Sequence, residues 1–402
     1  MASLVQNKDE DSNTNTAPPQ PESEEQQISD QVAPPPADEN LPANENSNEE
    51  GSRPDRHSDD EGVIEVQNTA SNIAGDIMSL QEQIHNHDHN HESGDCKCES
   101  DEKKIVLPGD LVELNPESDY LYIVGTQGQK VNKIAGLESL TKCEDITLRS
   151  CLITKMEGLS HMTQLTRLEL YDNQVEALEG LDRLLGLTVL DMSFNMVRAM
   201  APVAPLGNLK ELYLAQNKLR AIEGLAGLTA LTKLDLGANR IRVLQGLETL
   251  VNLEELWMGK NKIEKIQGLE ALTKLGRLDV QSNRLTAVEG LQTLTALREL
   301  YLANNRISEA RNLEAQAMLN TLDLSTNQLT SVGGLAGLTT LEELWMSSNQ
   351  IATFEAVQPL VTLTQLDCIY LEHNPISKDF EYRKRLKEMF PWLKQIDATM
   401  AK

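Results

Sequence analysis

The feature that most constrains this chain is an asparagine that recurs at intervals of 22 residues between positions 173 and 349. The same apolar frame surrounds each one, and it reads L-x-x-L-x-L-x-x-N-x-I in the stretch from Leu231 to Ile241. The recurring asparagines are called the ladder positions below, together with Cys151 one period earlier and Asn374 after a final gap of 25 residues. They are Cys151, Asn173, Asn195, Asn217, Asn239, Asn261, Asn283, Asn305, Asn327, Asn349 and Asn374.

This period and frame are typical of leucine-rich repeats, whose periods are roughly 20–29 residues. Each L-x-L triplet, such as Leu234–Leu236, predicts a short strand with two residues pointing inward and one outward. The rest of a 22-residue unit is too short for a long α-helix, so we expect 3₁₀ turns and extended backbone around Gly-Leu pairs such as Gly224–Leu225. The sequence therefore predicts an α/β solenoid, a leucine-rich repeat horseshoe with a parallel β-sheet on its concave face and a cap at each end.

The ladder asparagines are expected to be structural. A side-chain amide in the turn after a strand offers donors and an acceptor to backbone groups of its own and neighbouring repeats. Without those hydrogen bonds the backbone groups are buried and unpaired, at about 1–3 kcal/mol each. We interpret Cys151 in the same way, as a filler of the ladder and not as a nucleophile.

Three regions divide the chain at residues 104 and 374. Residues 105–374 form the predicted solenoid, and residues 375–402 form a C-terminal cap with an amphipathic helix over 379–386 and Trp392 in its core. Both ends of a solenoid need cover, because the terminal strands otherwise expose apolar edges. The N-terminal cap is expected to shield the first repeat with Leu111, Val112, Leu114, Tyr120 and Tyr122.

Residues 1–104 are predicted to be a disordered acidic tail. Residues 1–100 hold 23 Asp and Glu, only 4 Lys and Arg, and no aromatic residue, so they bury too little apolar surface to offset the entropy of ordering. An apolar stripe at helical spacing over 63–84 predicts a short helix that either docks or forms transiently. Ser58 precedes an acidic run, which is either a site for an acid-directed kinase or a solvated charge run.

A tract rich in histidine and cysteine follows at residues 85–98. Imidazole and thiolate groups bind Zn, Cu or Ni, but the spacing H-x-H-x-H-x-H differs from that of folded structural zinc sites. The tract is therefore either a weak chelator or a low-complexity segment without a metal, and we expect no other cofactor. The candidate ligands are His85, His87, His89, His91, Cys96 and Cys98.

Charge and hydropathy narrow the classes of partner. A formal charge of −26 without a basic face argues against nucleic acid. No run of roughly 18 apolar residues is present, so no membrane span is expected. The five cysteines suggest no disulfide framework and the N-terminus does not read as a secretory signal, so the expected compartment is the cytosol or the nucleus.

The central column, defined as the residues four positions before each ladder position, is predicted to point out from the concave sheet. Acidic and aromatic residues alternate along it, and a glutamate stands two positions before most of the aromatic ones, as Glu343 does before Trp345. Exposed Trp and Tyr among carboxylates and small residues are typical of protein–protein hot spots. The predicted partner-binding residues are Glu169, Asp191, Tyr213, Asp235, Trp257, Asp279, Tyr301, Asp323, Glu343, Trp345 and Tyr370.

The same column does not favour catalysis. Its aspartates are expected about 10 Å apart on an open sheet, whereas the paired carboxylates of glycosidases stand about 5–9 Å apart in a cleft. No histidine lies in the column, and the repeats contain no glycine-rich phosphate loop. We therefore expect a protein that binds other proteins and is not an enzyme.

Several segments carry a resemblance to a known family, namely Leu168–Asn173, Gln281–Thr286, Tyr382–Arg383 and Gln395–Thr399. Together with the repeats, over about residues 115–402, they resemble the regulatory subunit 7 family of protein phosphatase 1. The resemblance implies a concave face that binds the catalytic subunit of the type 1 Ser/Thr phosphatase and regulates or matures it. It also implies a nuclear and cytoplasmic location, roles in mitosis, and a further phosphatase regulator as a candidate third member. The family's contact positions fall on Asp191, Tyr213, Asp235, Trp257, Asp323, Glu343, Trp345 and Tyr370.

Two other interpretations stay open. A leucine-rich scaffold subunit of a ribonucleoprotein or ciliary assembly has the same class of repeat, although it is expected to carry a basic stripe or a different concave column. A metal-handling protein would act through residues 85–98 and use the solenoid as an anchor. Deletion of the tail separates the last interpretation from phosphatase binding, because only metal handling depends on the tail.

Overall fold

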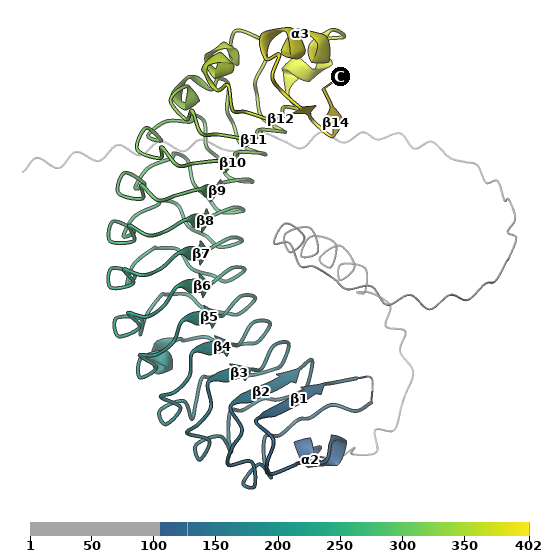
Figure 1. Cartoon of the computed structure of the whole chain (residues 1–402), viewed down its shortest axis with the longest axis vertical. Coiled ribbons are helices and arrows are strands. Elements are labelled where there is room, and N and C mark those ends of the chain that lie inside the picture. The colour runs from purple at the N-terminus through teal and green to yellow at the C-terminus, as the bar shows by residue number, and fades with distance from the viewer. Residues whose placement is uncertain (1–104, 127, 402) are drawn as a thin grey trace, which may run out of the picture. The chain divides into compact units, whose positions relative to one another are not determined.

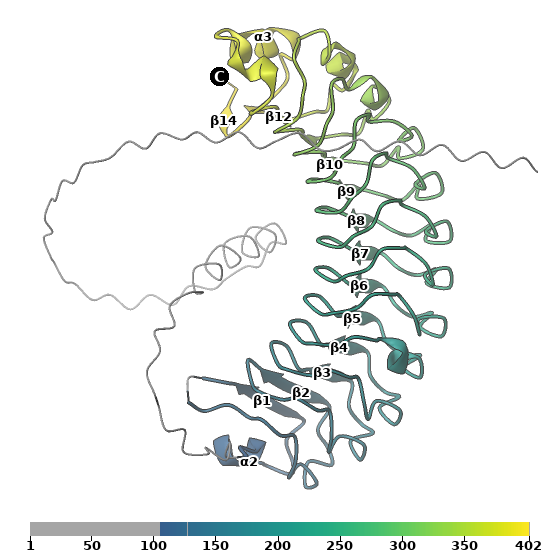
Figure 2. The ribbon, with the colours of Figure 1, turned by 180° about the vertical axis from the view of Figure 1, so that it is seen from behind.

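The computed structural model describes residues 105–126 and 128–401. This part forms one sheet of 14 strands in sequence order, with parallel pairing along the repeats and an antiparallel pair, β13 and β14, at the end. The strands line the inner side of an arc and the connecting turns form its outer side (Figure 1), as the view from behind also shows (Figure 2). The strands are β1 (Tyr120–Val124), β2 (Asp145–Arg149), β3 (Arg167–Glu169), β4 (Val189–Asp191), β5 (Glu211–Tyr213), β6 (Lys233–Asp235), β7 (Glu255–Trp257), β8 (Arg277–Asp279), β9 (Glu299–Tyr301), β10 (Thr321–Asp323), β11 (Glu343–Trp345), β12 (Cys368–Tyr370), β13 (Gln395–Ile396) and β14 (Thr399–Met400).

The predicted solenoid is confirmed, and its core is the apolar frame of the repeats. Leu231, Leu234 and Leu236 are fully buried, and the equivalent residues of neighbouring repeats extend the same core along the arc. Each strand of the repeats is only three residues long, apart from β1 and β2. A single repeat cannot bury its leucines alone, so stability comes from each unit together with its two interfaces.

Turn geometry explains two recurring sequence features. The residue before each ladder position has a φ between 51° and 59°, which turns the chain out of the strand. On the convex side Gly290 has a φ of 71°, and a Cβ there would stand 2.3 Å from the Ile266 carbonyl oxygen. Asn312 takes the same place one repeat later with a φ of 61°, as asparagine tolerates this region better than most residues.

The convex side has fewer 3₁₀ segments than the sequence predicts. The structure has η2 (Ala201–Val203), η3 (Gly333–Leu335) and η4 (Gln358–Thr362) there. Around Gly224–Leu225 a single turn forms instead, in which the Leu228 N–H donates to the Leu225 carbonyl over 2.9 Å. The chain must return to the sheet at once, so most repeats stop after one such turn.

The N-terminal cap differs from the expectation in the direction of two tyrosines. Leu111, at the end of α2 (Pro108–Leu111), and Leu114 pack against the first repeat as predicted. Tyr120 and Tyr122, however, are 63% and 59% exposed. Alternation along β1 turns Leu121 into the core and its neighbours outward, so the prediction that these tyrosines shield the repeat is wrong.

The C-terminal cap closes the other end of the sheet. It contains η5 (Pro375–Lys378) and α3 (Tyr382–Met389), which begins three residues later than the helix expected from the sequence. Phe390 is fully buried, and Trp392 is partly buried against it in an edge-to-face contact with ring centroids 6.0 Å apart.

Several predictions lie outside the described residues: the disordered tail, the helix over 63–84, Ser58, and the candidate metal ligands His85, His87, His89, His91, Cys96 and Cys98. Within residues 105–126 and 128–401, no helix is long and apolar enough to cross a membrane.

Candidate protein-binding face

The central column forms one continuous row across the concave face. Parallel register sets Asp191 beside Tyr213, Tyr213 beside Asp235, and Asp235 beside Trp257. The row also extends beyond the predicted residues, because Glu169 pairs with Thr147 and Thr147 with Tyr122. From β1 to β12 it reads Tyr122, Thr147, Glu169, Asp191, Tyr213, Asp235, Trp257, Asp279, Tyr301, Asp323, Trp345 and Tyr370.

The ladder asparagines fix the turns that hold this row in place. The Asn261 amide donates to the carbonyls of Leu236, 2.9 Å away in the preceding repeat, and of Met258, 3.1 Å away in its own. Its oxygen accepts the Ile241 N–H over 3.0 Å. Each ladder asparagine repeats this pattern and is buried. Cys151 is buried as well, and its thiol donates to the Arg149 carbonyl over 3.3 Å.

The aspartates of the central column are less exposed than the sequence suggests. They are half-buried, and Asp323 is only 9% exposed, because large aromatic side chains stand on the strands next to them. Each accepts the backbone N–H two residues later, for example Gly237 N–H to Asp235 over 2.8 Å. The other three such bonds join Asp191 to Ser193, Asp279 to Gln281 and Asp323 to Ser325 at 2.8, 2.9 and 2.8 Å. These carboxylates therefore stabilise their own turns as well as facing the concave side.

Burial disfavours the ionised form of these carboxylates. Desolvation raises the pKa of Asp235 to about 7, and the neighbouring charges of Asp279 and Asp191 add to the effect. Desolvation also raises the pKa of Asp191, Asp279 and Asp323, although a hydrogen bond from the following turn opposes it in each case. The middle of the concave face is therefore less negative near neutral pH than its composition suggests.

Basic residues beside the central column were missed in the sequence. Lys233 lies 3.5 Å from Glu255, and Arg277 lies 2.7 Å from Glu299. They occupy the outward position at the start of β6 and β8, so they alternate with the glutamates that start β5, β7 and β9. The sequence shows these basic residues as the first letter of the triplets K-L-D at Lys233–Asp235 and R-L-D at Arg277–Asp279, in repeats whose central-column residue is an aspartate and not an aromatic residue.

The last repeats have no such compensation. Tyr301, Trp345 and Tyr370 form the C-terminal aromatic cluster, with ring centroids 6.3 and 6.4 Å apart. Glu343 lies next to this cluster at the start of β11 and has no basic partner among the described residues. Burial and the charges of Glu342 and Glu299 raise its pKa. Within the same part of the chain, the buried indole N–H of Trp345 finds no acceptor.

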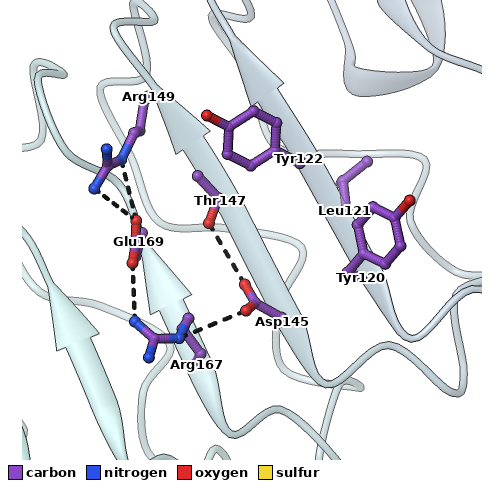
Figure 3. Close-up of a pocket in the computed structure, with 8 residues that line it drawn as sticks. All are labelled: Tyr120, Leu121, Tyr122, Asp145, Thr147, Arg149, Arg167 and Glu169. Carbon is purple, nitrogen blue, oxygen red and sulfur yellow. Dashed lines mark hydrogen bonds and ion pairs between the residues drawn. The ribbon is translucent and has the colours of Figure 1, made fainter. Parts of the chain in front are cut away.

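The opposite end of the face is organised around Glu169. Its carboxylate is held by Arg149 and Arg167, each 3.0 Å away, and Arg167 also approaches Asp145 at 3.5 Å (Figure 3). These residues line a shallow pocket of about 370 Å³ together with Tyr120, Leu121, Tyr122 and Thr147. Glu169 was predicted as part of an acidic column, but here its charge is matched by two guanidinium groups.

The described residues of the concave face present a large surface with one shallow pocket beside Glu169. The described residues contain no group of three or more His, Cys, Asp and Glu that could hold a metal ion. Burial raises the pKa of the Cys368 thiol, which lies on the concave face, to about 11, so it is a poor nucleophile. The geometry suits contacts with a large surface.

Comparison with known sequences supports the repeat assignment. Residues 207–249, 229–271 and 318–359 match the family described as leucine rich repeats (2 copies). The protein phosphatase 1 regulatory subunit pprA of Dictyostelium discoideum is 49% identical over 37 residues, which are 9% of this chain. The match spans about a tenth (11%) of that relative's length.

Solved structures show the same architecture. An internalin, InlF, from Listeria monocytogenes is 26% identical with a TM-score of 0.63, covering 69% of this chain and 79% of the internalin. The leucine-rich repeat protein LIC12759 of Leptospira interrogans is 22% identical with a TM-score of 0.56. The match covers 66% of this chain and 76% of that protein, and it shows the fold alone. The described residues thus have the leucine-rich repeat fold, an architecture that typically presents an extended concave surface for binding other proteins.

Proposed function

We propose that this protein is a non-enzymatic regulatory subunit that binds the catalytic subunit of a type 1 Ser/Thr protein phosphatase through its concave face. The observation that carries the proposal is the C-terminal aromatic cluster beside the unpaired Glu343. Aromatic side chains in a partly desolvated patch are the usual anchors of protein interfaces. An adjacent carboxylate selects a basic partner surface and mainly increases the association rate.

Two further observations support the choice of partner. The matched relative from Dictyostelium discoideum is itself named as a regulatory subunit of protein phosphatase 1. The concave row is continuous over β1–β12, which is long enough for a whole folded domain and not only for a peptide. As part of the proposal, binding controls the activity or maturation of the phosphatase in the nucleus and cytoplasm, including during mitosis, and a further phosphatase regulator is a candidate third member.

The test is calorimetric titration of the full chain with the type 1 catalytic subunit. We expect sub-micromolar affinity, equivalent to about −8 kcal/mol or better. The double variant Glu343→Gln/Trp345→Ala should lose roughly 2 kcal/mol or more, or about 30-fold in Kd. Circular dichroism should show that the variant still melts cooperatively.

A matched control is Phe380→Ala, which removes an aromatic ring that is 96% exposed on the C-terminal cap, away from the strands. It should leave the affinity unchanged. Failure of a cooperatively folded wild-type chain to bind the phosphatase would refute the proposal. Equal losses in Phe380→Ala and in the double variant would place the interface elsewhere.

A further inference from the structure

A column of basic side chains runs along the side of the solenoid, directly after the ladder turns. The residue that follows the ladder asparagine is Lys or Arg in five consecutive repeats. In each of these repeats it is half-buried or exposed, whereas the asparagine before it and the apolar residue after it are buried. Its side chain therefore points away from the core. These residues are called the basic column below, and they are Lys218, Arg240, Lys262, Arg284 and Arg306.

Backbone hydrogen bonds hold the basic column in register. The Arg240 N–H donates to the Leu219 carbonyl of the preceding repeat over 2.8 Å, and the Lys262 N–H donates to the Ile241 carbonyl over the same distance. The other three members make the equivalent bond at 2.8 or 2.9 Å. Members on successive repeats are thus direct neighbours, roughly 5 Å apart, and the column is about 20 Å long.

The fold does not require a basic residue at this position. Met196 stands there one repeat before the column, and Gln328 and Gln350 stand there in the two repeats after it. Like charges on adjacent strands are destabilising. Within the described residues, Arg284 is the one member of the column in an ion pair, with Glu264 at 3.8 Å. The other four cations are kept without internal compensation, which indicates a role in binding.

The positions on both sides of the column add to its positive charge. Beyond the buried apolar residue, Arg198, Arg220 and Arg242 are exposed in three successive repeats. On the other side, the residues before the five ladder asparagines are Lys260 and four uncharged residues. Glu264 is the one carboxylate at these flanking positions. The prediction of a chain without a basic face is therefore wrong for this side of the solenoid, because a formal charge gives only the sum over all sides.

We propose that the basic column binds an acidic segment of a partner protein, in which Asp or Glu side chains recur along an extended backbone. Carboxylates accept charge-assisted hydrogen bonds from guanidinium and ammonium groups, and these bonds are stronger than neutral ones. A segment of about six to eight residues spans roughly 20–26 Å when extended, which matches the length of the column. The column lies outside the concave row, so this inference does not depend on the partner proposed there.

Single-stranded RNA is the competing occupant, because a subunit of a ribonucleoprotein is expected to carry a basic stripe. Proteins that hold single strands combine a basic groove with aromatic side chains on which the bases stack. Neither the column nor its flanking positions in these five repeats hold an aromatic residue. A long polyanion would also meet the carboxylates on the rest of a chain whose formal charge is −26. A short acidic segment can stay within a Debye length of the column, about 8 Å at physiological salt, so the observations favour a protein segment.

The test is fluorescence anisotropy of the full chain with two rhodamine-labelled, capped octapeptides, one alternating Glu with Ser and the other alternating Gln with Ser. At about 50 mM salt the Glu peptide should bind saturably and the Gln peptide should not. Arg240→Gln/Lys262→Gln should weaken binding of the Glu peptide by about three- to tenfold, as expected for the loss of two exposed charge pairs. At about 0.5 M salt this difference from the wild type should disappear.

The matched control is Gln174→Glu/Gln350→Glu, which changes the formal charge by the same amount at the same position of the repeat. Gln174 and Gln350 each lie two repeats beyond an end of the column, about 10 Å from it. The control should therefore bind the Glu peptide within about twofold of the wild type. Because glutamine already occupies this position in other repeats, both double variants should melt as the wild type does in circular dichroism.

Three results would overturn the proposal. The first is the absence of saturable binding of the Glu peptide. The second is an equal loss in the double variant and in its matched control, which would mean that net charge alone governs binding. The third is tighter binding of an oligouridylate of the same charge than of the Glu peptide, which would assign the column to nucleic acid.

The remaining occupant is the acidic N-terminal part of the chain itself. Residues 1–100 hold 23 Asp and Glu and only 4 Lys and Arg, and a tethered segment competes at a high effective concentration. Their deletion removes none of the described residues. If the Glu peptide bound the shortened chain about tenfold more tightly than the full chain, or better, the column would be assigned to these residues and not to a partner.

Discussion

The two ends of the concave face share one frame but differ in how their charges are paired. At β1–β3, Glu169 is held between Arg149 and Arg167, so the surface is neutral and its charged groups are fixed in place. At β9–β12 the outward positions include no Lys or Arg. They hold Glu299, Asp323 and Glu343 around the C-terminal aromatic cluster, and among these only Glu299 has a basic partner, Arg277 of β8. Because folding dictates only the inward leucines and the ladder, the outward positions are free to give each end its own binding chemistry.

The largest expected effect comes from breaking the shared frame. Asn261→Ala removes the acceptor of the Ile241 N–H and the donor to the Leu236 and Met258 carbonyls, all of them buried. Unpaired groups of this kind cost about 1–3 kcal/mol each, so the variant should lose roughly 3 kcal/mol or more in urea denaturation. Cys151→Ala is the control at an equivalent ladder position, where the side chain is a thiol and no amide is lost. Equal losses in the two variants would contradict the role assigned to the asparagine amide.

The second prediction compares the two tryptophans of the central column in phosphatase binding. Trp345 contacts Tyr301 and Tyr370 and lies beside the unpaired Glu343, whereas Trp257 lies on β7, next to the ion pair of Lys233 with Glu255. Trp345→Ala should therefore cost roughly 2 kcal/mol or more in calorimetry, and Trp257→Ala less. If Trp257→Ala proved the more costly, the centre of the face would be the main contact and the contrast between its ends would matter less.

The third prediction concerns pH. The pKa of Asp235 is raised to about 7 in the folded protein, whereas an unfolded aspartate titrates near about 4. The folded state therefore holds this proton more tightly, and stability falls as the pH rises from about 4 to about 7. Asp235→Asn keeps an acceptor for the Gly237 N–H but cannot ionise. Its stability relative to wild type should grow by about 2–3 kcal/mol between pH 5 and pH 8, measured by urea denaturation.

A matched carboxylate at the neutral end should respond with the opposite sign. Glu169→Gln leaves Arg149 and Arg167 without their shared carboxylate, so it should destabilise the chain by about 1 kcal/mol at pH 7. Asp235→Asn and Glu169→Gln thus distinguish a carboxylate whose ionisation destabilises the fold from one whose negative charge stabilises it. Stabilisation by both substitutions at pH 8 would mean that the whole face suffers from excess negative charge.

Much of this arrangement was predictable because a solenoid repeats one local solution. The inward positions, the ladder and the row from Asp191 to Trp345 follow from a period of 22 residues and strand alternation. The burial of Asp235 did not follow, because it depends on the bulk of Tyr213 and Trp257 on the adjacent strands. How deeply a side chain is buried depends on the register, which sets its neighbours, and on the space that those neighbours leave. The sequence predicts the register but not that space.

The N-terminal end was harder to predict because it departs from the repeat. The sequence predicts Tyr120 and Tyr122 as part of the cap, because they lie before the first ladder position and no ladder residue sets their inward register. In the structure Leu121 takes the inward place and both tyrosines face outward. The arginines around Glu169 were readable in the sequence, but their common partner lies 20 residues from Arg149 and only two from Arg167. Recognising that both meet one carboxylate requires coordinates.

The smallest expected effect comes from a variant that tests whether charge pairing alone distinguishes the two ends of the concave face. Lys233 lies 3.5 Å from Glu255 at the centre of the face, and Lys233→Glu would make this region resemble the uncompensated strands near the C-terminus. Stability should change by about 0.5 kcal/mol or less, because the pair is partly exposed. The association rate with the phosphatase should rise about two- to threefold at low salt and return to the wild-type value at high salt, because a rim charge acts mainly through long-range attraction.

The control is Lys233→Gln, which removes the positive charge without adding a negative one. Its association rate in stopped-flow measurements should lie between those of the wild type and Lys233→Glu. A slower association in Lys233→Glu would show that the partner presents an acidic surface to the centre of the face, which would confine its basic contacts to β9–β12.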